Sequence, residues 1–232
     1  MIEASFESQK ALCSVNPSIA PRPYAWGSYE TDPTTHFMLT EFREVGQQPP
    51  EPVQFAHRVA QLHETSVSPT GKFGFHVTSM AGPIPVRNNG WSDSWEEAFS
   101  NFLGNLLDLD RNANQPWLEL EHIKHLIMTR VIPRLLRPLQ SNGRDIKPCL
   151  VHGNLWDGNT ATDLKTGEPF IFDPKCFYAH NEYETGNWRA PRHRLSDKMY
   201  MRQYQRNFPV SKPGRMTLHC FRCVVSATST VN

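Results

Sequence analysis

Cysteine, net charge and long hydrophobic runs are all scarce in this 232-residue sequence. Its five cysteines are an odd number in a chain too large to need stapling, which argues against a disulfide framework and favours a reducing compartment. The 24 Lys and Arg residues nearly balance 23 Asp and Glu residues, so the net charge of +1 gives no global electrostatic case for binding nucleic acid or acidic membranes. No stretch approaches the roughly 18 apolar residues of a membrane-spanning helix, and charges near the start argue against a secretory signal. We therefore expect a cytoplasmic protein without nucleic-acid or membrane partners.

The sequence does contain enough apolar and aromatic residues to build a core. Hydrophobic residues make up 38% and aromatic residues 11% of the chain, so buried surface can offset chain entropy. At about 150 residues per domain, the length predicts one to one and a half domains. The 19 prolines predict many loops between short elements.

Hydrophobic spacing and turn signals predict a helical middle flanked by short strands. Pro52 suits the first turn of a helix, and Ser94 with Glu97 makes a capping box before an apolar stripe. We expect Pro133 to end or kink its helix. In chain order the predicted elements are a helix over 3–13, an extended Pro-rich connection over 17–27, a buried strand over 36–42, a helix over 52–64, an irregular surface segment over 66–89, helices over 94–106 and 120–135, and strands at 149–152, 159–162 and 170–173, the last two forming a hairpin.

The most informative stretch is HGNLWDGN at residues 152–159, followed fourteen residues later by Asp173. Phosphoryl transfer needs a residue that orients the acceptor hydroxyl and accepts its proton, and two residues whose oxygens hold magnesium on the nucleotide phosphates. A kinase catalytic loop of the form H-x-D-x-x-x-x-N, a hairpin and a metal-binding aspartate supply these groups in that order. Asn159 and Asp173 stand at the metal-binding spacing. The simpler alternative is an ordinary turn, since Gly and Asn tolerate left-handed backbone.

At this point the sequence resembles a known family. LVHGNLWDGN at residues 150–159 and FIFDPKCFYAHNEYE at 170–184 are similar to the signature of the fructosamine/ketosamine 3-kinase family, of the protein-ribulosamine 3-kinase type. FESQKALCSVNP, HFMLTEFREV and SWEEAFSNFL also look like fungal members, in the same order. The resemblance covers roughly residues 1–209.

The resemblance implies an α+β, protein-kinase-like fold with a mostly helical large lobe and a partial small lobe. We expect residues 1–45 to be a small-lobe remnant with a helix and a hinge strand, residues 46–209 the large lobe, and residues 210–232 an atypical tail. It also implies that the chain is truncated at both ends, because the matching helix begins almost at Met1 and the last residues do not resemble the family.

The activity implied is ATP-dependent phosphorylation, with Mg²⁺, of the 3-hydroxyl of ketosamines (ribulosamine or fructosamine) on glycated protein lysines or free amines, as in protein deglycation. Asn159 and Asp173 would hold the magnesium, and His152 would shape the catalytic loop around Asn154. The adenine would bind at a hinge formed by Glu41, Phe42 and Arg43. The residues expected near the acceptor sugar are Phe73, Phe75, Trp91, Trp156, His180 and Glu182.

Departures from the family pattern at the base position and at the N-terminus favour an alternative, a catalytically impaired kinase-like fragment with only binding or no function. Asn154 replaces the family's catalytic aspartate, and an amide cannot accept the hydroxyl proton. Loss of a general base slows such reactions by roughly 10²–10⁴-fold. No G-x-G-x-x-G occurs, no small-lobe lysine precedes the first helix, and the family's helix glutamate falls on Ser5. Asp157 is a weaker candidate for a replacement base.

Other local patterns have simpler explanations. Gly71 and Lys72 do not form a phosphate-binding loop, because Phe73 follows where that motif needs Ser or Thr. Cys220 and Cys223 beside a histidine do not have a second ligand pair at zinc spacing. His122 and His125 lie about one helical turn apart, which fits a solvated face better than a metal site.

Overall fold

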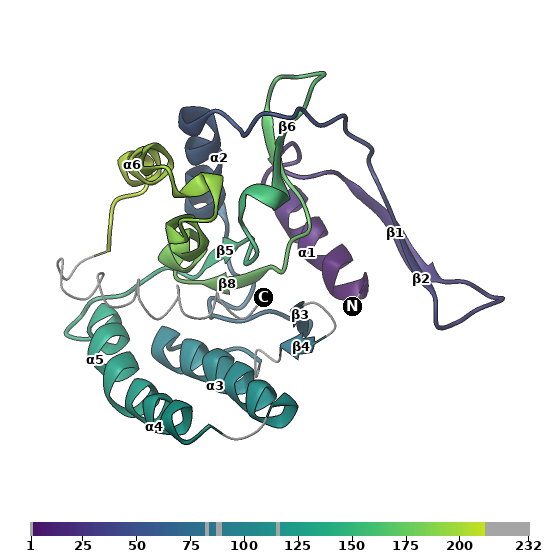
Figure 1. The fold of residues 1–232 in the computed structure, drawn as a ribbon. Helices are drawn as coiled ribbons and strands as arrows, with labels where there is room; N and C mark the ends of the chain where they lie inside the picture. The colour runs from purple at the N-terminus through teal and green to yellow at the C-terminus, as the bar shows by residue number, and fades with distance from the viewer. Residues whose placement is uncertain (1, 82–83, 87–89, 115–116, 212–232) are drawn as a thin grey trace.

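The computed structural model describes residues 2–81, 84–86, 90–114 and 117–211. The elements run in the order α1 (Ile2–Val15), β1 (Pro23–Ser28), β2 (His36–Thr40), α2 (Pro52–Thr65), β3 (Ser79–Ala81), β4 (Ile84–Val86), α3 (Trp95–Ala113), α4 (Leu118–Leu126), a π-helical turn (Ile127–Val131), α5 (Ile132–Leu136), β5 (Cys149–Val151), β6 (Thr160–Thr162), β7 (Pro169–Ile171), β8 (Phe177–Ala179) and α6 (Lys198–Asn207). Short 3₁₀ segments cover 137–140, 157–159, 181–189 and 194–196. Figure 1 shows α3, α4 and α5 below the β5–β8 strands, with α2 and α6 above them.

The first two helices confirm the predictions for 3–13 and 52–64. At the start of α2 the carboxylate of Glu51 accepts hydrogen bonds from the backbone N–H groups of Val53 and Gln54, and Pro52 occupies the first turn, where it loses no helical hydrogen bond. The apolar face of α2, with Phe55 and Val59, is buried in the core. This helix packs along α6, so residues far apart in the sequence meet here.

The strand predicted at 36–42 exists as β2, but the prediction that it is buried is wrong. Phe37 is 39% and Leu39 57% exposed. The physical reason is that β2 pairs, among the described residues, only with β1, in a two-stranded hairpin that projects from the body (Figure 1). Its partner β1 lies in the predicted Pro-rich connection, and Pro23 is tolerated there because it is the first residue of the strand.

The segment predicted as an irregular surface loop, 66–89, instead runs into the core and contains β3 and β4. Phe73 and Phe75 are only 1% and 4% exposed. Gly74 exchanges two backbone hydrogen bonds with Tyr178 of β8, at 2.8 and 2.9 Å. A Cβ at Gly74 would lie 2.3 Å from the carbonyl oxygen of Gly90, so glycine permits this close approach. The sequence pattern indicates a loop here because Phe73 and Gly74 pair with other segments only through single β-bridges, which are too short to show a strand periodicity in the sequence.

The helical middle follows the predicted pattern. Ser94 caps α3 by accepting a hydrogen bond from the N–H of Glu97 at 3.3 Å, whereas the Glu97 carboxylate binds the hydroxyl of Ser92 at 2.5 Å. The predicted helix over 120–135 is divided by the π-helical turn just before Pro133, where the N–H of Ile132 bonds to the carbonyl of Ile127. Proline has no N–H to donate to the preceding turn, so the regular α-helical bonding is interrupted where the break was expected.

The core consists of two buried clusters that meet at the β5–β8 ladder. Leu150 and Tyr178 belong to the first cluster, with α1, α2 and α6, whereas Val151 and Ala179 belong to the second, with α3 and α5. Adjacent residues of one strand point to opposite faces, so one face of this short ladder packs into the first cluster and the other face into the second. The chain leaves β5 directly into the loop at 152–159.

No helix in the described part of the chain is long and apolar enough to cross a membrane. The predicted cytoplasmic location stays a prediction, as does the division into residues 1–45, 46–209 and 210–232. Cys220 and Cys223 lie outside the described residues. His122 and His125 are both exposed, as expected for a solvated face.

Candidate active site

The candidate site forms where the loop after β5 meets the residue that follows β7. Strands β6 and β7 pair antiparallel with Thr160 opposite Ile171, which places Asn159 and Asp173 at the same end of the hairpin. The backbone N–H of Phe172 bonds to the carbonyl of Asn159 at 3.1 Å and extends this pairing by one step. The hairpin predicted from sequence therefore brings together the two residues predicted to bind metal.

Asn154 lies between these two residues and bonds to both. Its side-chain Nδ2 donates to Oδ2 of Asp173 at 3.0 Å, and its backbone carbonyl accepts from Nδ2 of Asn159 at 2.9 Å. The Asn159 amide is thereby oriented, since its nitrogen is used and its Oδ1 remains the acceptor end. Asn159 is buried and Asp173 is exposed. All three residues predicted at the catalytic position and the metal site thus form one hydrogen-bonded group.

His152 is fully buried beneath this group and supports it through both ring nitrogens. Its Nδ1 accepts the backbone N–H of Asn154 at 3.2 Å, so Nε2 must carry the proton that is donated to the carbonyl of Phe172 at 3.0 Å. Burial lowers the pKa of His152 below its usual value of 6.5. A neutral ring in a single tautomer therefore links the loop to the residue before Asp173, which agrees with the predicted loop-shaping role.

Two left-handed backbone positions fix the turn around the site. Gly153 has φ of +75°, and a Cβ there would lie 2.3 Å from the carbonyl oxygen of Lys175. Asp173 has φ of +54°, a conformation that non-glycine residues adopt rarely and that clusters at functional sites. The N–H of Lys175 bonds to the carbonyl of His152 at 2.8 Å, so the two turns hold each other.

Sequence reasoning missed Glu184, which anchors the loop from below. Its carboxylate, buried between the two core clusters, accepts the backbone N–H groups of His152 and Gly153, the latter at 3.2 Å. On its other side it lies 3.6 Å from Nε2 of His63, whose Nδ1 bonds at 2.8 Å to the hydroxyl of Tyr204. The resemblance pointed to Glu182 in the same segment. The sequence signal for Glu184 was a second acidic residue in an otherwise buried stretch. The residues that it contacts could not be found from sequence spacing.

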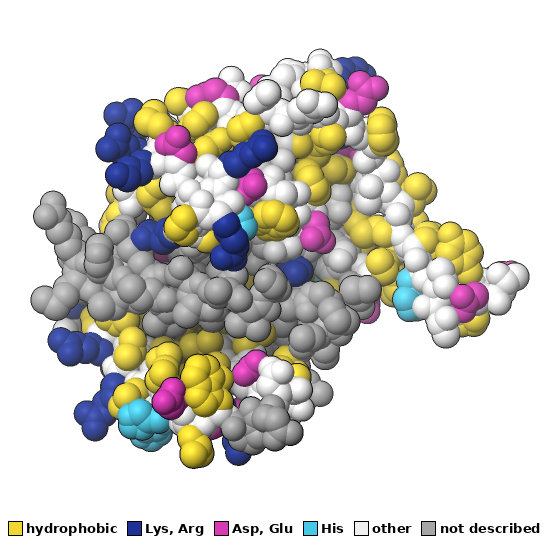
Figure 2. All heavy atoms as spheres, in the orientation of Figure 1, with side chains coloured by type: hydrophobic (Ala, Val, Ile, Leu, Met, Phe, Trp, Pro, Cys, Tyr) yellow, Lys and Arg dark blue, Asp and Glu magenta, His cyan; other side chains and the backbone are white. Residues whose placement is uncertain are grey.

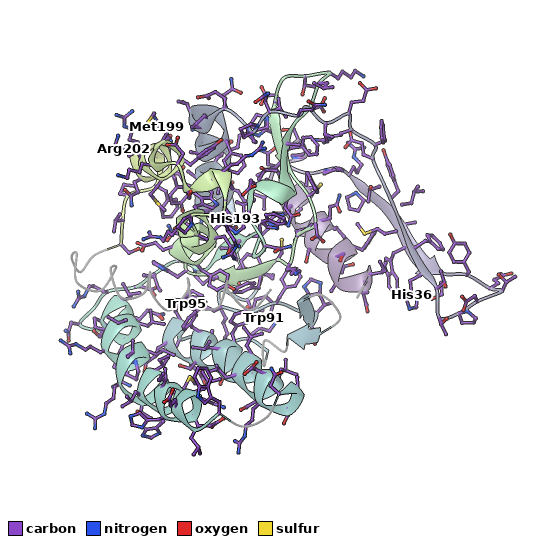
Figure 3. All side chains as sticks on the ribbon, in the orientation of Figure 1. His36, Trp91, Trp95, His193, Met199 and Arg202 are labelled. Atoms are coloured by element: carbon purple, nitrogen blue, oxygen red, sulfur yellow. The ribbon has the colours of Figure 1, made fainter. Side chains whose placement is uncertain are left out.

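Trp156 and Asp157 contact the segment that precedes α6. The Trp156 ring lies 5.4 Å from the ring of His193, between centroids, and is partly exposed. The Asp157 carboxylate bonds to Nδ1 of His193 at 3.1 Å and to the backbone N–H of Arg194 at 3.0 Å. These bonds commit the Asp157 carboxylate to His193 and Arg194, which argues against its use as a replacement base. Figure 3 labels His193 between α6 and the site hairpin.

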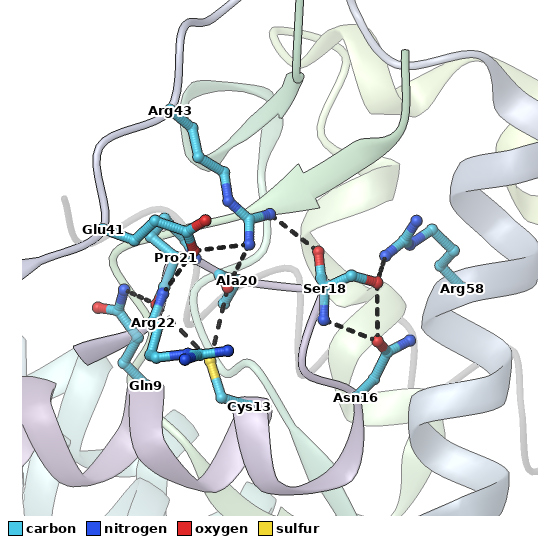
Figure 4. A network of polar contacts seen from close by, with 10 residues as sticks. All are labelled: Gln9, Cys13, Asn16, Ser18, Ala20, Pro21, Arg22, Glu41, Arg43 and Arg58. Atoms are coloured by element: carbon cyan, nitrogen blue, oxygen red, sulfur yellow. Dashed lines mark hydrogen bonds and ion pairs between the residues drawn. The ribbon is translucent and has the colours of Figure 1, made fainter. Parts of the chain in front are cut away.

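The predicted hinge follows β2 and lies beside the site hairpin, because the N–H of Gly46 bonds to the carbonyl of Thr162 at 2.9 Å. Arg43 donates to Oε2 of Glu41 at 2.9 Å and to the carbonyls of Ser18 and Ala20 (Figure 4). Bonds from Arg43 and from the Arg22 backbone N–H lower the pKa of Glu41.

In the same segment the side chain of Phe42 is 85% exposed. The side chains of Glu41 and Arg43 are thus used to fix the segment, and the backbone between them is the part still available to bind a base.

The residues predicted near the acceptor sugar do not form one surface. Phe73 and Phe75 are core residues, and His180 is buried, with its Nε2 bonded to the hydroxyl of Ser211 at 2.9 Å. Burial, with a smaller contribution from His63, lowers the pKa of His180 to about 3. Trp91 is half-buried, with its ring 6.0 Å from that of Tyr178 (Figure 3).

The remaining two predicted sugar-side residues are Glu182 and Trp156, and neither is part of the buried core. The Glu182 carboxylate accepts the N–H of Ser211 at 3.2 Å. Of the six predicted residues, only Trp156 is both exposed and part of the loop at 152–159, two positions after Asn154. The sugar-side roles stay predictions.

The oxygen atoms at the site suit a hard divalent cation. Asp173 contributes a carboxylate and Asn159 an amide oxygen, which are ligand types that Mg²⁺ prefers, usually together with substrate phosphates. Within the described residues no group of three or more His, Cys, Asp and Glu side chains could hold a metal by itself. The residues present therefore fit a cation shared with a bound phosphate.

The site is built, in chain order, from a buried strand, a loop, a hairpin and an aspartate in left-handed conformation. This order fits the protein-kinase-like fold, which solved structures confirm. A structure from Haemophilus somnus 129PT, provisionally named fructosamine-3-kinase, superposes with a TM-score of 0.70 at 20% identity over 97% of this chain and 69% of that one. The aminoglycoside phosphotransferase APH(4)-Ia, solved with AMP-PNP and hygromycin B, gives a TM-score of 0.59 at 14% identity over 95% and 73% of the two chains.

Residues 1–217 match the family model described as fructosamine kinase, and the chain belongs to that family. A relative from Oryza sativa subsp. japonica, "Protein-ribulosamine 3-kinase, chloroplastic", is 33% identical over 192 residues, which are 82% of this chain and 53% of the relative. The "Ketosamine-3-kinase" of Mus musculus is 37% identical over 120 residues, 49% of this chain and 34% of the relative. The chain spans about half the length of the rice relative and about a third of the mouse relative. The resemblance inferred from the motifs is thus confirmed.

Proposed function

We propose that this chain carries the phosphoryl-transfer site of a ketosamine kinase, which uses ATP with Mg²⁺ and takes ribulosamine or fructosamine groups as acceptors. The observation that carries the proposal is the position of Asn154, which bonds to both Asn159 and Asp173. This is the arrangement that a kinase needs to hold a cation beside an acceptor hydroxyl. The names of the rice and mouse relatives support the ketosamine class of substrate.

Each part of the site has a role under this proposal. Asp173 and the Oδ1 of Asn159 would hold Mg²⁺, which when bound neutralises charge on the nucleotide phosphates. The backbone of residues 41–43 would bind the adenine, apart from the N–H of Glu41, which already bonds to the carbonyl of Arg22 at 2.8 Å. The side chains of Glu41 and Arg43 are bonded to their own chain. His152 would keep the loop in place as a neutral donor and acceptor.

The acceptor side would be formed by Asn154 and Trp156. The Asn154 amide can orient a sugar hydroxyl by hydrogen bonding, and the exposed indole of Trp156 gives the apolar face of a sugar a flat surface to rest on. The amide cannot take up the proton that the hydroxyl releases. We therefore propose slow transfer, by roughly 10²–10⁴-fold, relative to a site with a carboxylate at this position.

The experiment is phosphate transfer to ribulosyl-lysine and fructosyl-lysine, measured at high protein concentration for the wild-type chain and for Asn154→Asp. We expect a trace rate in the wild type and a rate higher by about 10²-fold or more in Asn154→Asp. Asp173→Asn, which removes the charged ligand, is the control and is expected to abolish transfer in both backgrounds. Absence of transfer from all of them would overturn the proposed activity.

A second candidate function, nucleotide binding without turnover, is favoured by the bonds that the carboxylates of Asp157 and Asp173 already make. Asp157 is bonded to His193 and Arg194, and Asp173 accepts the Asn154 amide, so neither is placed as a base. Calorimetry with ATP in the presence and absence of Mg²⁺ distinguishes the two candidates. Magnesium-dependent binding in a protein that shows no transfer even as Asn154→Asp would support the binding function. If no ATP binding is measurable, the binding function is excluded as well.

A further inference from the structure

Positive charge is concentrated in one short part of the chain, residues 189–206. This segment holds six of the 24 Lys and Arg residues and one acidic residue, Asp197. The rest of the sequence holds 18 basic and 22 acidic residues, so the near-zero net charge conceals a strong segregation. Figure 2 shows Lys and Arg side chains gathered over α6.

Four of these residues form a line that we call the basic row: Arg194, Lys198, Arg202 and Arg206. They are four residues apart, and the last three lie along α6 on the side opposite its buried face of Tyr200, Gln203 and Tyr204. All four are exposed. Figure 3 shows Arg202 on α6 at the outer surface. The three members on α6 are helical neighbours, about 6 Å apart along the axis. Arg194 lies in the 3₁₀ segment just before the helix.

The start of the basic row is electrostatically unfavourable for α6. Lys198 begins α6, where the helix macrodipole is positive, and like charges four residues apart repel one another. In the part of the chain that the structure describes, no ion pair joins the row to a carboxylate. The nearby carboxylate of Asp197 is used to cap α6 through the N–H of Met199, at 2.8 Å. Only Arg206, in the last turn, suits the helix macrodipole, and it donates to Oε1 of Gln203 at 3.3 Å. The other three members of the row have no ion-pair partner among the described residues.

The row starts at the rim of the candidate active site. The backbone N–H of its first member, Arg194, bonds to Asp157 of the catalytic loop, and the preceding His193 lies against Trp156. A polypeptide whose modified lysine entered at Asn154 and Trp156 would have to leave over a neighbouring surface. The row is a charged surface that begins directly beside that entrance.

We infer that the basic row binds an acidic segment of polypeptide, an inference that rests on the proposed function because the segment would belong to the protein that carries the ketosamine. An extended chain advances about 6.6 Å per two residues, close to the spacing of the row, so carboxylates at alternate positions match successive cations. Binding of single-stranded nucleic acid uses exposed aromatic rings, whereas Tyr200 and Tyr204 of α6 are buried. Membrane attachment needs several apolar side chains, and on α6 only Met199, 41% exposed, offers one.

The test is fluorescence anisotropy with a labelled 12-residue peptide of alternating Glu and Ser, added to the whole chain. We expect binding that weakens with salt and that Lys198→Glu with Arg202→Glu weakens at least about 10-fold. The matched control is Arg130→Glu with Arg134→Glu, two exposed cations four residues apart on the helical segment over 118–136, which should change affinity less than about 2-fold. Because Lys198→Glu places an anion at a helix start, the melting temperature of the first variant should not fall.

Three results would overturn the inference: unchanged peptide affinity in the row variant, equal loss in the control variant, or tighter row-dependent binding of a single-stranded oligonucleotide or of anionic vesicles. The assay needs neither nucleotide nor ketosamine, so it is independent of phosphate transfer. If the peptide binds through the row but no phosphate is transferred, the acidic-segment site stands and only the proposed kinase function fails. If phosphate is transferred to free fructosyl-lysine but no acidic peptide binds, the kinase function stands and the acidic-segment site fails.

Discussion

At the scale of single residues, Asn154 differs from an aspartate in what it does to Asp173. The amide donates a hydrogen bond to Oδ2 of Asp173 and so partly neutralises a carboxylate that a cation would otherwise neutralise. An aspartate at the same place would put two negative groups in contact, which raises the pKa of one of them or attracts a cation. The substitution therefore changes the metal dependence of the site as well as its supply of a base.

We predict that Asn154→Asp makes the stability of the folded chain depend on magnesium. Without Mg²⁺ the two carboxylates repel, and the free energy of unfolding should fall by about 1 kcal/mol, whereas millimolar Mg²⁺ should restore it. The wild-type chain should respond much less. The measurement is urea unfolding with Mg²⁺ or with EDTA, and Asn101→Asp, which adds the same charge on α3, should show no magnesium response. Equal responses of the two variants would contradict the prediction.

We predict that Glu184→Gln destabilises the chain and loosens the catalytic loop. Glutamine has one acceptor oxygen and an NH₂ group, so one of the backbone N–H groups of His152 and Gly153 would face a donor in a buried place. The expected loss is about 1.5–3 kcal/mol in the free energy of unfolding. Hydrogen exchange of residues 152–153 should also accelerate. The exposed Glu64→Gln on α2 is the control, expected within about 0.5 kcal/mol of wild type, and a similarly small effect of Glu184→Gln would refute the anchoring role.

At the scale of elements, sequence patterns located what is continuous along the chain. The hairpin of β6 and β7, its terminal Asp173 and the loop at 152–159 were all found, because register and turn chemistry fix them within a few residues. Helix α6 was not predicted, because its buried face consists of Tyr200, Gln203 and Tyr204 and shows no aliphatic stripe. Strand β8 was missed because three residues are too few for a period.

The turn at Gly153 supports an element-scale prediction. We expect Gly153→Ala to disrupt the β5 loop, because a Cβ at φ of +75° would lie 2.3 Å from the backbone oxygen of Lys175. Strain of this kind costs about 1–3 kcal/mol before the clash is counted. Urea unfolding measures the loss. Gly71→Ala, at φ of +72° with open space around it, isolates the backbone contribution, and equal losses in the two variants would show that the contact with Lys175 has no effect.

At the scale of the whole molecule, the site lies where two core clusters meet, and its support comes from distant parts of the chain. Glu184, His63 on α2 and Tyr204 on α6 converge beneath residues 152–153. No sequence spacing relates these residues. The sequence located the loop and the residues predicted to bind metal, but not the buried residues that support them. The exposure of β2 was mispredicted for a similar reason, because burial depends on which other layers cover a strand.

Two buried histidines make global stability depend on pH. Burial lowers the pKa of His152, and lowers that of His180 to about 3, below the 6.5 that both have when exposed. The unfolded chain therefore binds more protons below pH 6.5, and the free energy of unfolding should fall as pH drops from about 6.5, by up to about 1.4 kcal/mol per pH unit for each histidine. Above pH 7 these groups should have no effect.

Urea unfolding at pH 7.5, 6.5 and 5.5 measures this dependence. His180→Gln removes one of the two groups and should flatten the slope below pH 6.5. The exposed His122→Gln should leave the slope as it is. A slope as steep in His180→Gln as in the wild type would mean that His180 does not contribute to the acid sensitivity.

The contact between Trp156 and His193 gives the candidate site a spectroscopic property of its own. The indole is held by a ring 5.4 Å away and by Gly158, where a Cβ would lie 2.3 Å from it, so its orientation is fixed while 37% of the residue stays in water. A tryptophan half in solvent emits at longer wavelength than buried ones such as Trp95 and Trp188, and a nearby imidazole quenches it once protonated. The fluorescence of Trp156, obtained as the difference in emission between the wild type and Trp156→Phe, should therefore change when a ligand binds at the loop. This signal needs neither a label nor turnover.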